Sequence, residues 1–193
     1  ALGGKTGIGL SGGGANSTNT VLRKVFAFIK RVTNVSATSG DLQINATDNS
    51  EILSEVGTGS IGASSTAGAS IGVSLARNFI GYSDADTKGT DQVKAYIESS
   101  TVTARDIQLL ADEDATITAR VGTASVGFAY SKDGTSISAS GAGVESTNKI
   151  STVVEAYISS DSITATRNVS VQAQDESDIS TDAGAASIAI SYA

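Results

Sequence analysis

The sequence predicts an all-β fold, a β-solenoid in which strands of successive coils stack in parallel. Three observations support this prediction: a segment that occurs three times, alternation of apolar with small or polar residues inside each copy, and strand segments too short to be helices of ten or more residues. Ser, Thr and Val, which are frequent in these segments, also favour strands.

The repeated segment is clearest at residues 93–111, and related segments begin at residues 25 and 154. Ala27 and Ala95 are 68 positions apart, and Ala95 and Ala156 are 61 apart. A period that varies by a few residues indicates strands that repeat and loops that differ. We expect either two coils of about thirty residues or three of about twenty in each unit.

The Gly-rich start belongs to the same repeat. Residues 11–20 match residues 140–149 at a separation of 129, the sum of the two spacings. We therefore expect this start to be ordered structure and not a flexible linker. The whole of 1–193 is then one continuous array, and its units lie approximately at 1–24 (the end of a preceding unit), 25–92, 93–153 and 154–193 (incomplete). Because a repeat is under way at residue 1 and no initiator Met is present, we expect an excerpt of a longer protein.

Each unit contains segments of two kinds, which differ in their content of charged residues. Residues 21–31 look weakly amphipathic, but their counterparts alternate as strands do, so we predict a strand. Residues 56–62, 121–127 and 183–190 are almost free of charge and rich in Gly and Ala. Such segments suit a sheet that another layer approaches closely, either residues 69–75 of the same coil or an adjacent molecule.

An antiparallel β-sandwich or roll is the alternative fold. It requires hairpin turns of the Asn-Gly type, and the chain has only one good candidate, at residues 132–135.

The composition excludes several kinds of chemistry. The 193 residues contain no Pro, Cys, Met, Trp or His, so thiol nucleophiles, imidazole bases and ordinary zinc sites are excluded. The net charge of −7 disfavours nucleic acid as a partner. No apolar run is long enough to span a membrane, so membrane insertion is not expected.

The chain resembles the repeats of giant bacterial surface proteins of the filamentous-adhesin and leukotoxin type. The likeness lies in the order of residues 69–74, 79–81, 93–97, 100–104 and 107–111. It implies a secreted, right-handed parallel β-helical shaft, hence an extracellular or cell-surface location in bacteria. The acidic insertion at residues 82–91, which departs from the pattern, puts a uniform shaft geometry there in doubt.

Acidic residues provide one candidate site. Asp84, Asp86 and Asp91 lie in the insertion, where converging carboxylates would bind calcium. Two further clusters occupy equivalent places in two repeats, with Asp48 as their counterpart in the first, and we interpret them as a solvated acidic ridge. These clusters are Asp112, Glu113 and Asp114, and Asp175, Glu176 and Asp178. No cofactor is expected apart from calcium at the site in the insertion.

Aromatic residues provide a second candidate. Phe28, Tyr96 and Tyr157 share one position between inward Ala and inward Ile, so they should point outward as a column. Such a column would either contact a surface glycan or protein receptor, or shield the small residues of the neighbouring coil.

These observations predict a non-enzymatic segment, a structural or adhesive shaft of a large bacterial surface protein. Its partners would be adjacent repeats of the same chain and, by end-to-end stacking, further copies in a homopolymer. The alternatives are a calcium-dependent adhesion module and, further away, a polysaccharide-processing β-helix enzyme. The enzyme would need an open groove over Arg105 or Arg167, which are equally explained as charge partners of the acidic turns.

Overall fold

The computed structural model describes residues 7–132, 134–160 and 162–193 and has the predicted parallel β-solenoid architecture. The described residues contain no helix, and they form five separate sheets of three strands each. Every pairing between the named strands is parallel. The antiparallel sandwich or roll is therefore wrong. Asp133 of the candidate hairpin turn and residues 1–6 of the first unit lie outside the described residues.

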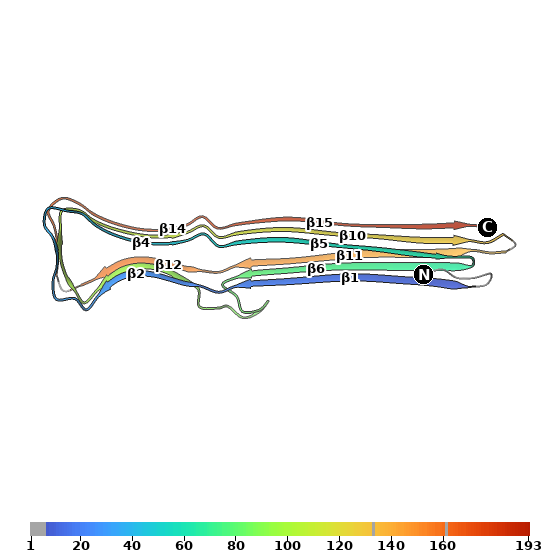
Figure 1. The fold of residues 1–193 in the computed structure, drawn as a ribbon, viewed down its shortest axis with the longest axis horizontal. Coiled ribbons are helices and arrows are strands. Elements are labelled where there is room, and N and C mark those ends of the chain that lie inside the picture. Colours follow the sequence, from blue (N-terminus) through green and yellow to red (C-terminus); the bar gives the residue numbers. More distant parts are fainter. Residues whose placement is uncertain (1–6, 133, 161) are drawn as a thin grey trace.

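Five strands make each coil, and the coils stack in chain order (Figure 1). The first coil contains β1 (Ile8–Val21), β2 (Lys24–Lys30), β3 (Val35–Ala37), β4 (Leu42–Asp48) and β5 (Glu51–Ser64). The second contains β6 (Ala67–Ile80), β7 (Gln92–Glu98), β8 (Thr101–Ala104), β9 (Ile107–Glu113) and β10 (Thr116–Tyr130). The third contains β11 (Ile137–Ile150), β12 (Val153–Ser159), β13 (Ser162–Ala165), β14 (Val169–Asp175) and β15 (Asp178–Tyr192).

One repeat unit is one coil. Ala27, Ala95 and Ala156 pair directly across β2, β7 and β12, so the repeat spacing equals one complete turn of the chain. The expectation of two or three coils per unit is wrong, because the long segments 67–80 and 116–130 are opposite sides of one wide coil. The Gly-rich start is ordered over β1, where Ser11 aligns with Ser140 through Ser70 at the predicted separation. Residues 24–30 form a strand as predicted.

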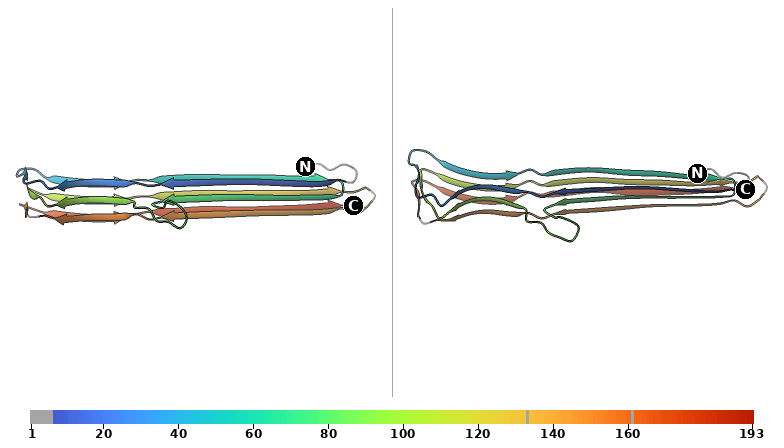
Figure 2. Two further views of the ribbon diagram at one scale, coloured as in Figure 1. Left: turned by 90° about the horizontal axis from the view of Figure 1, so that it is seen from below. Right: turned by 60° about the horizontal axis from the view of Figure 1, so that its bottom comes forward.

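Each coil has two regions (Figures 1 and 2). We call the region built from β2–β4, β7–β9 and β12–β14 the rounded end. The arm is the region where the β1–β6–β11 sheet faces the β5–β10–β15 sheet, and its tip is where β5 turns into β6. The junction is where the rounded end meets the arm.

The rounded end has an ordinary hydrophobic core. Burial alternates along β7 and β9, and the inward side chains form one cluster. Ile97, Val102 and Leu109 are fully buried in it. Burying side chains of this size contributes about 1.5–3 kcal/mol each, which makes this cluster the main hydrophobic stabilisation of the coil.

The arm has two small apolar clusters near the junction, around Ile117 and Val121, and a core of small and hydroxyl side chains toward the tip. A Cβ atom added at Gly62 would overlap the carbonyl oxygen of Ala69, and one added at Gly68 would overlap that of Phe128. The two sheets therefore approach each other as the Gly- and Ala-rich composition predicted, and the second layer is part of the same solenoid. Between them, Ser125 Oγ donates to Ser70 Oγ at 2.8 Å, and Ser60 Oγ lies 2.8 Å from Ser70 Oγ.

The insertion leaves the coil at the junction and returns to it. β6 ends at Ile80, Gly81 has a left-handed φ of 75°, and Tyr82 forms an antiparallel bridge with Lys88. The amide of Gly89 then donates to the carbonyl of Gly81 at 2.7 Å, which closes the loop. β7 resumes in register with β2, so the stack of coils continues past the insertion.

Candidate functional site

The predicted aromatic column is continuous. Phe28 and Tyr96 stack with ring centroids 5.1 Å apart, and Tyr96 and Tyr157 stack at 5.0 Å. The rings are on the outer side of the coil, since Ala95 and Ile97 on either side of Tyr96 are buried. Each inner ring face is covered by the next ring, so ring edges and the two ends of the column remain for contact with a partner.

The insertion separates the three carboxylates considered for calcium. Asp84 Oδ1 accepts hydrogen bonds from the backbone amides of Asp86 and Thr87, at 3.0 and 2.9 Å, which lowers its pKa. Asp86 is exposed, whereas Asp91 is only 5% exposed and belongs to the junction. Within residues 7–132, 134–160 and 162–193, no three acidic side chains lie close enough together to hold a metal ion.

Some side chains of the acidic turn at the end of β9, and of its counterparts in the other coils, point toward the interior of the coil. Asp48, Glu113 and Asp175 occupy equivalent positions in β4, β9 and β14, as the sequence comparison indicated. Asp48 is 5% exposed and Glu113 is fully buried. The expectation of a solvated ridge is therefore wrong for these two residues, because alternation along the strand turns them toward the interior of the coil.

The residue that faces these carboxylates across the junction differs from one coil to the next. In the first coil, Arg23 forms an ion pair with Asp48 at 2.8 Å. Asp91 and Thr152 occupy the positions that correspond to Arg23 in the second and third coils. The arginine of the first coil is thus replaced by a second carboxylate in the middle coil.

Glu113 is the most perturbed titratable group at the junction. Burial raises its pKa to about 7, the hydrogen bond from Thr152 Oγ1 at 3.1 Å opposes the shift, and the charges of Asp48, Asp175 and Asp91 add to it. Its Oε2 atom is buried and has no hydrogen-bond partner among the residues that the structure describes. Burial also raises the pKa of Asp91. The middle coil can therefore hold a proton here close to neutral pH.

Arg105 and Arg167 lie on the corner between the third and fourth strands of their coils. Arg105 binds Asp41 through two hydrogen bonds of 2.8 Å, and Arg167 reaches Asp106 at 3.5 Å. The pairing lowers the pKa of Asp41 and raises that of Arg105. Each arginine is thus bonded to an aspartate of the preceding coil.

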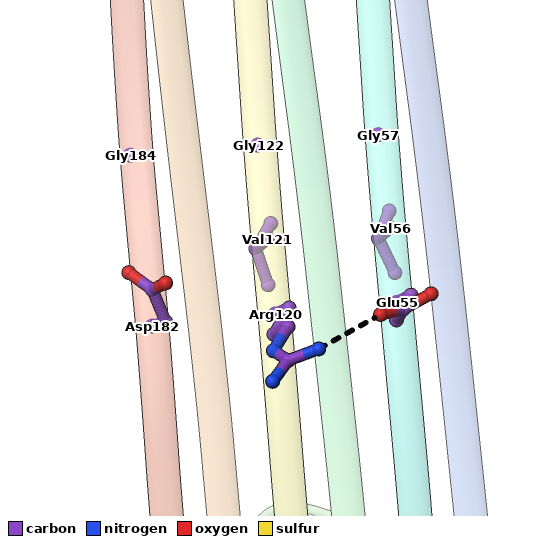
Figure 3. Close-up of a pocket in the computed structure, with 8 residues that line it drawn as sticks. All are labelled: Glu55, Val56, Gly57, Arg120, Val121, Gly122, Asp182 and Gly184. Atoms are coloured by element: carbon purple, nitrogen blue, oxygen red, sulfur yellow. Dashed lines mark hydrogen bonds and ion pairs between the residues drawn. The ribbon is translucent and has the colours of Figure 1, made fainter.

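The outer face of β5, β10 and β15 carries a feature that the sequence prediction missed. Gly57, Gly122 and Gly184 align across the three strands and form the floor of an open depression of about 460 Å³ (Figure 3). Arg120 borders it and forms an ion pair with Glu55 at 3.3 Å.

Toward the tip, the outer face changes from glycine to large apolar side chains. The exposed fractions are 66% for Ile61, 55% for Ile188, 40% for Phe128, 45% for Tyr130 and 65% for Tyr192. The alternation of these residues with the inward serines is visible in the sequence. It does not reveal which face is inside, because both faces of the strands also carry small residues.

No known family model, curated protein or solved structure matches this chain. No helix among the described residues is long and apolar enough to cross a membrane.

Proposed function

We propose that this chain is a structural segment of a large bacterial extracellular or cell-surface repeat protein, in which stacked coils build a broad, thin blade. The observation that carries the proposal is the register: three successive coils pair strand for strand, and the middle coil is paired on both sides. The partners of the segment are then adjacent coils of the same chain.

The dimensions favour a blade over a slender shaft. One side of a coil combines a strand of 14 residues with one of 7, which at about 3.3 Å per residue is roughly 70 Å long. Two facing sheets make it about 10 Å thick, and each coil adds only about 4.8 Å along the stack. Between 59 residues (Ile8 to Ala67) and 70 residues (Ala67 to Ile137) separate equivalent positions, so most of the chain contributes to width.

Stiffness along the stack comes from backbone hydrogen bonds in the five ladders. They are reinforced by side chains that interact with their counterparts in the next coil, such as the aromatic column and the pairing of Asn78 with Asn19 and Asn148 at 2.8 and 2.7 Å. The outer strands of the first and third coils each have one unpaired edge among the described residues. Such edges are places where a further coil adds.

A tandem fusion of two copies tests this proposal. Direct fusion leaves eight residues, Ala193 and residues 1–7, between β15 and the next β1, compared with six between β10 and β11. If coils add, the fusion melts more than about 5 °C above the single chain, as followed by circular dichroism, because one more coil interface is formed. The single chain at twice the molar concentration is the control. Equal melting temperatures would contradict the proposal.

A further inference from the structure

Toward the tip, the distribution of side chains in the arm is reversed relative to an ordinary β-sandwich. Nearer the junction the arm buries Ile52, Ile117, Val56 and Val121. Toward the tip, serine, threonine and glycine fill the space between the sheets, while large apolar residues face outward. From the row of Gly57, Gly122 and Gly184 to the tip, no outward residue of β5, β10 or β15 is charged. A contiguous exposed apolar patch of this kind marks an interaction surface.

This face is complementary to itself. Rows of Gly and Ala lie on the side of the junction. The rows on the side of the tip hold large residues in the second and third coils, and Ile61 followed by Ala63 in the first. A two-fold axis along the stacking direction, placed between Gly59 and Ile61, would set each row of large residues against a row of small ones in a second copy. The coils of both copies would then lie at the same level.

In the middle coil, individual large residues of one copy would face individual small residues of the other. Val126 would meet Ala124 of the second copy, and the ring of Phe128 would lie over Gly122. Tyr130 would reach the row of Glu55, Arg120 and Asp182, where a tyrosine ring stacks on a guanidinium group. Tyr130 is already held parallel to Tyr192, with the ring centroids 5.7 Å apart.

The opposite face also carries exposed apolar side chains, but they do not form continuous rows. Ile71 and Val73 of the middle coil each lie between glycines of the first and third coils, and Ile8 and Ile137 flank Ala67. No outward residue from Ala67 to Leu75, or at the aligned positions of β1 and β11, is aromatic. The strands of the β5–β10–β15 sheet also run nearly straight and side by side (Figure 2). Flat sheets of this kind are typically stabilised by stacking on another sheet.

We infer that the outer face of β5, β10 and β15 is a self-association surface that joins two copies of this chain face to face. The inference requires only the three-coil fold and does not depend on the proposed cellular role. The interface is isologous, because the same patch serves both copies.

The area makes affinity depend on the number of coils. Eleven positions along each strand at about 3.3 Å, and three strands at about 4.8 Å, give roughly 500 Å² per copy. Stable interfaces bury about 800 Å² per partner. Three coils therefore associate weakly, whereas six coils provide roughly twice the area and should form a stable pair.

Two pairs of variants test the surface by sedimentation equilibrium of the single chain at rising concentration and of the tandem fusion. Gly122→Val fills the groove, and Gly141→Val is its control, since an added Cβ meets nothing within 4 Å at either position. Phe128→Lys charges the patch, and Val73→Lys is its control on the opposite face, with the same exposed fraction of 40%. Circular dichroism confirms that each variant is folded.

We expect Gly122→Val and Phe128→Lys to raise the dissociation constant at least tenfold, and both control variants to change it less than twofold. The inference is overturned if the tandem fusion stays monomeric at about 100 μM, or if both faces respond equally. A monomeric chain that floats with neutral phospholipid vesicles, and loses this property in Phe128→Lys, would assign the face to a lipid surface and also overturn the inference. If the fusion fails to fold, the concentration series on the single chain decides.

Discussion

The rounded end and the arm are built on the same parallel ladders but are stabilised in different ways. The rounded end buries Ile, Val and Leu in one cluster, and its outer side carries polar residues together with the aromatic column. The arm buries Ile and Val only near the junction. Toward the tip it buries hydroxyl groups and glycine and leaves Ile, Phe and Tyr outside. Because the ladder hydrogen bonds are made by the backbone in both regions, the side chains near the tip of the arm do not need to form an apolar core.

Apolar clusters are present at the rounded end and in the part of the arm near the junction, but not toward the tip. There the arm is held by close approach of its sheets and by hydrogen-bonded hydroxyls, so its large residues are available for contacts outside the coil. Four expected outcomes test this contrast, from the largest effect to the smallest.

Leu109→Ala tests the apolar cluster of the rounded end. The side chain is fully buried, so we expect a loss of about 4 kcal/mol in the free energy of unfolding, from lost burial and the cavity left behind. Urea denaturation measures it. Ile71→Ala removes an aliphatic side chain that is 61% exposed on the arm and should cost less than about 0.5 kcal/mol. Similar losses in both variants would remove the contrast between the regions.

Gly68→Ala tests the close approach of the sheets in the arm. Its Cβ would overlap the backbone oxygen of Phe128, which cannot move without separating the sheets, so we expect a loss of about 3 kcal/mol. Gly122→Ala is the matched control, because its Cβ would point into open space. A fall in melting temperature for the first variant alone supports the account, and equal behaviour contradicts it.

Stability should depend on pH through Glu113. The folded chain binds a proton here up to about pH 7, whereas the unfolded chain releases it near 4.5, so the folded state holds more protons in between. The free energy of unfolding therefore falls as pH rises from about 4.5 to 7, by roughly 2–3 kcal/mol, and levels off above. Asp91, whose pKa is also raised, acts in the same direction.

Denaturation at a series of pH values measures this dependence, and Glu113→Gln should remove most of it because the amide does not ionise. Asp84→Asn, at an exposed position of the insertion, serves as the control. A Glu113→Gln profile parallel to that of the original chain would show that the junction does not bind this proton.

Ser125→Ala tests the hydroxyl network of the arm. Ser125 bonds to Ser70 and Ser60 and accepts a bond from Ser140 at 2.9 Å, so its loss leaves buried hydroxyls unpaired and should cost about 1–2 kcal/mol. Removing Ser70 as well should cost less than the sum of the single changes. Strict additivity would mean that the hydroxyls do not act as a network. Ser180→Ala, on the outer face, should be nearly neutral.

Much of the fold could be predicted from the repeat. The spacings from Ala27 to Ala95 and Ala156 equal the observed register, and the match between residues 11–20 and 140–149 identified β1 as ordered. The number of coils per unit could not be read in this way. A repeat spacing fixes the residues that pair after one unit but not the path of the chain within that unit. In addition, the sequence comparison missed that residues 70–79 are equivalent to residues 11–20 and 140–149.

The candidate surfaces were harder to predict for a physical reason. Gly, Ala and Ser give little hydrophobic contrast between the two faces of a strand, so alternation in β5 and β10 does not reveal the inner side. The burial of Glu113 was hidden because an acidic run usually marks a solvated turn. The aromatic column was identified correctly as a column because a bulky residue recurs at one position of a clear strand pattern.

The stacked rings also provide an optical assay for the two regions. The chain has five tyrosines and no tryptophan, and four of the tyrosines lie in two parallel pairs, Tyr96 with Tyr157 in the rounded end and Tyr130 with Tyr192 near the tip. Parallel chromophores at this separation couple their transitions, so each region has its own near-ultraviolet dichroic signal. Phenylalanine at one pair silences that signal, and the remaining one reports separately on the melting of the other region.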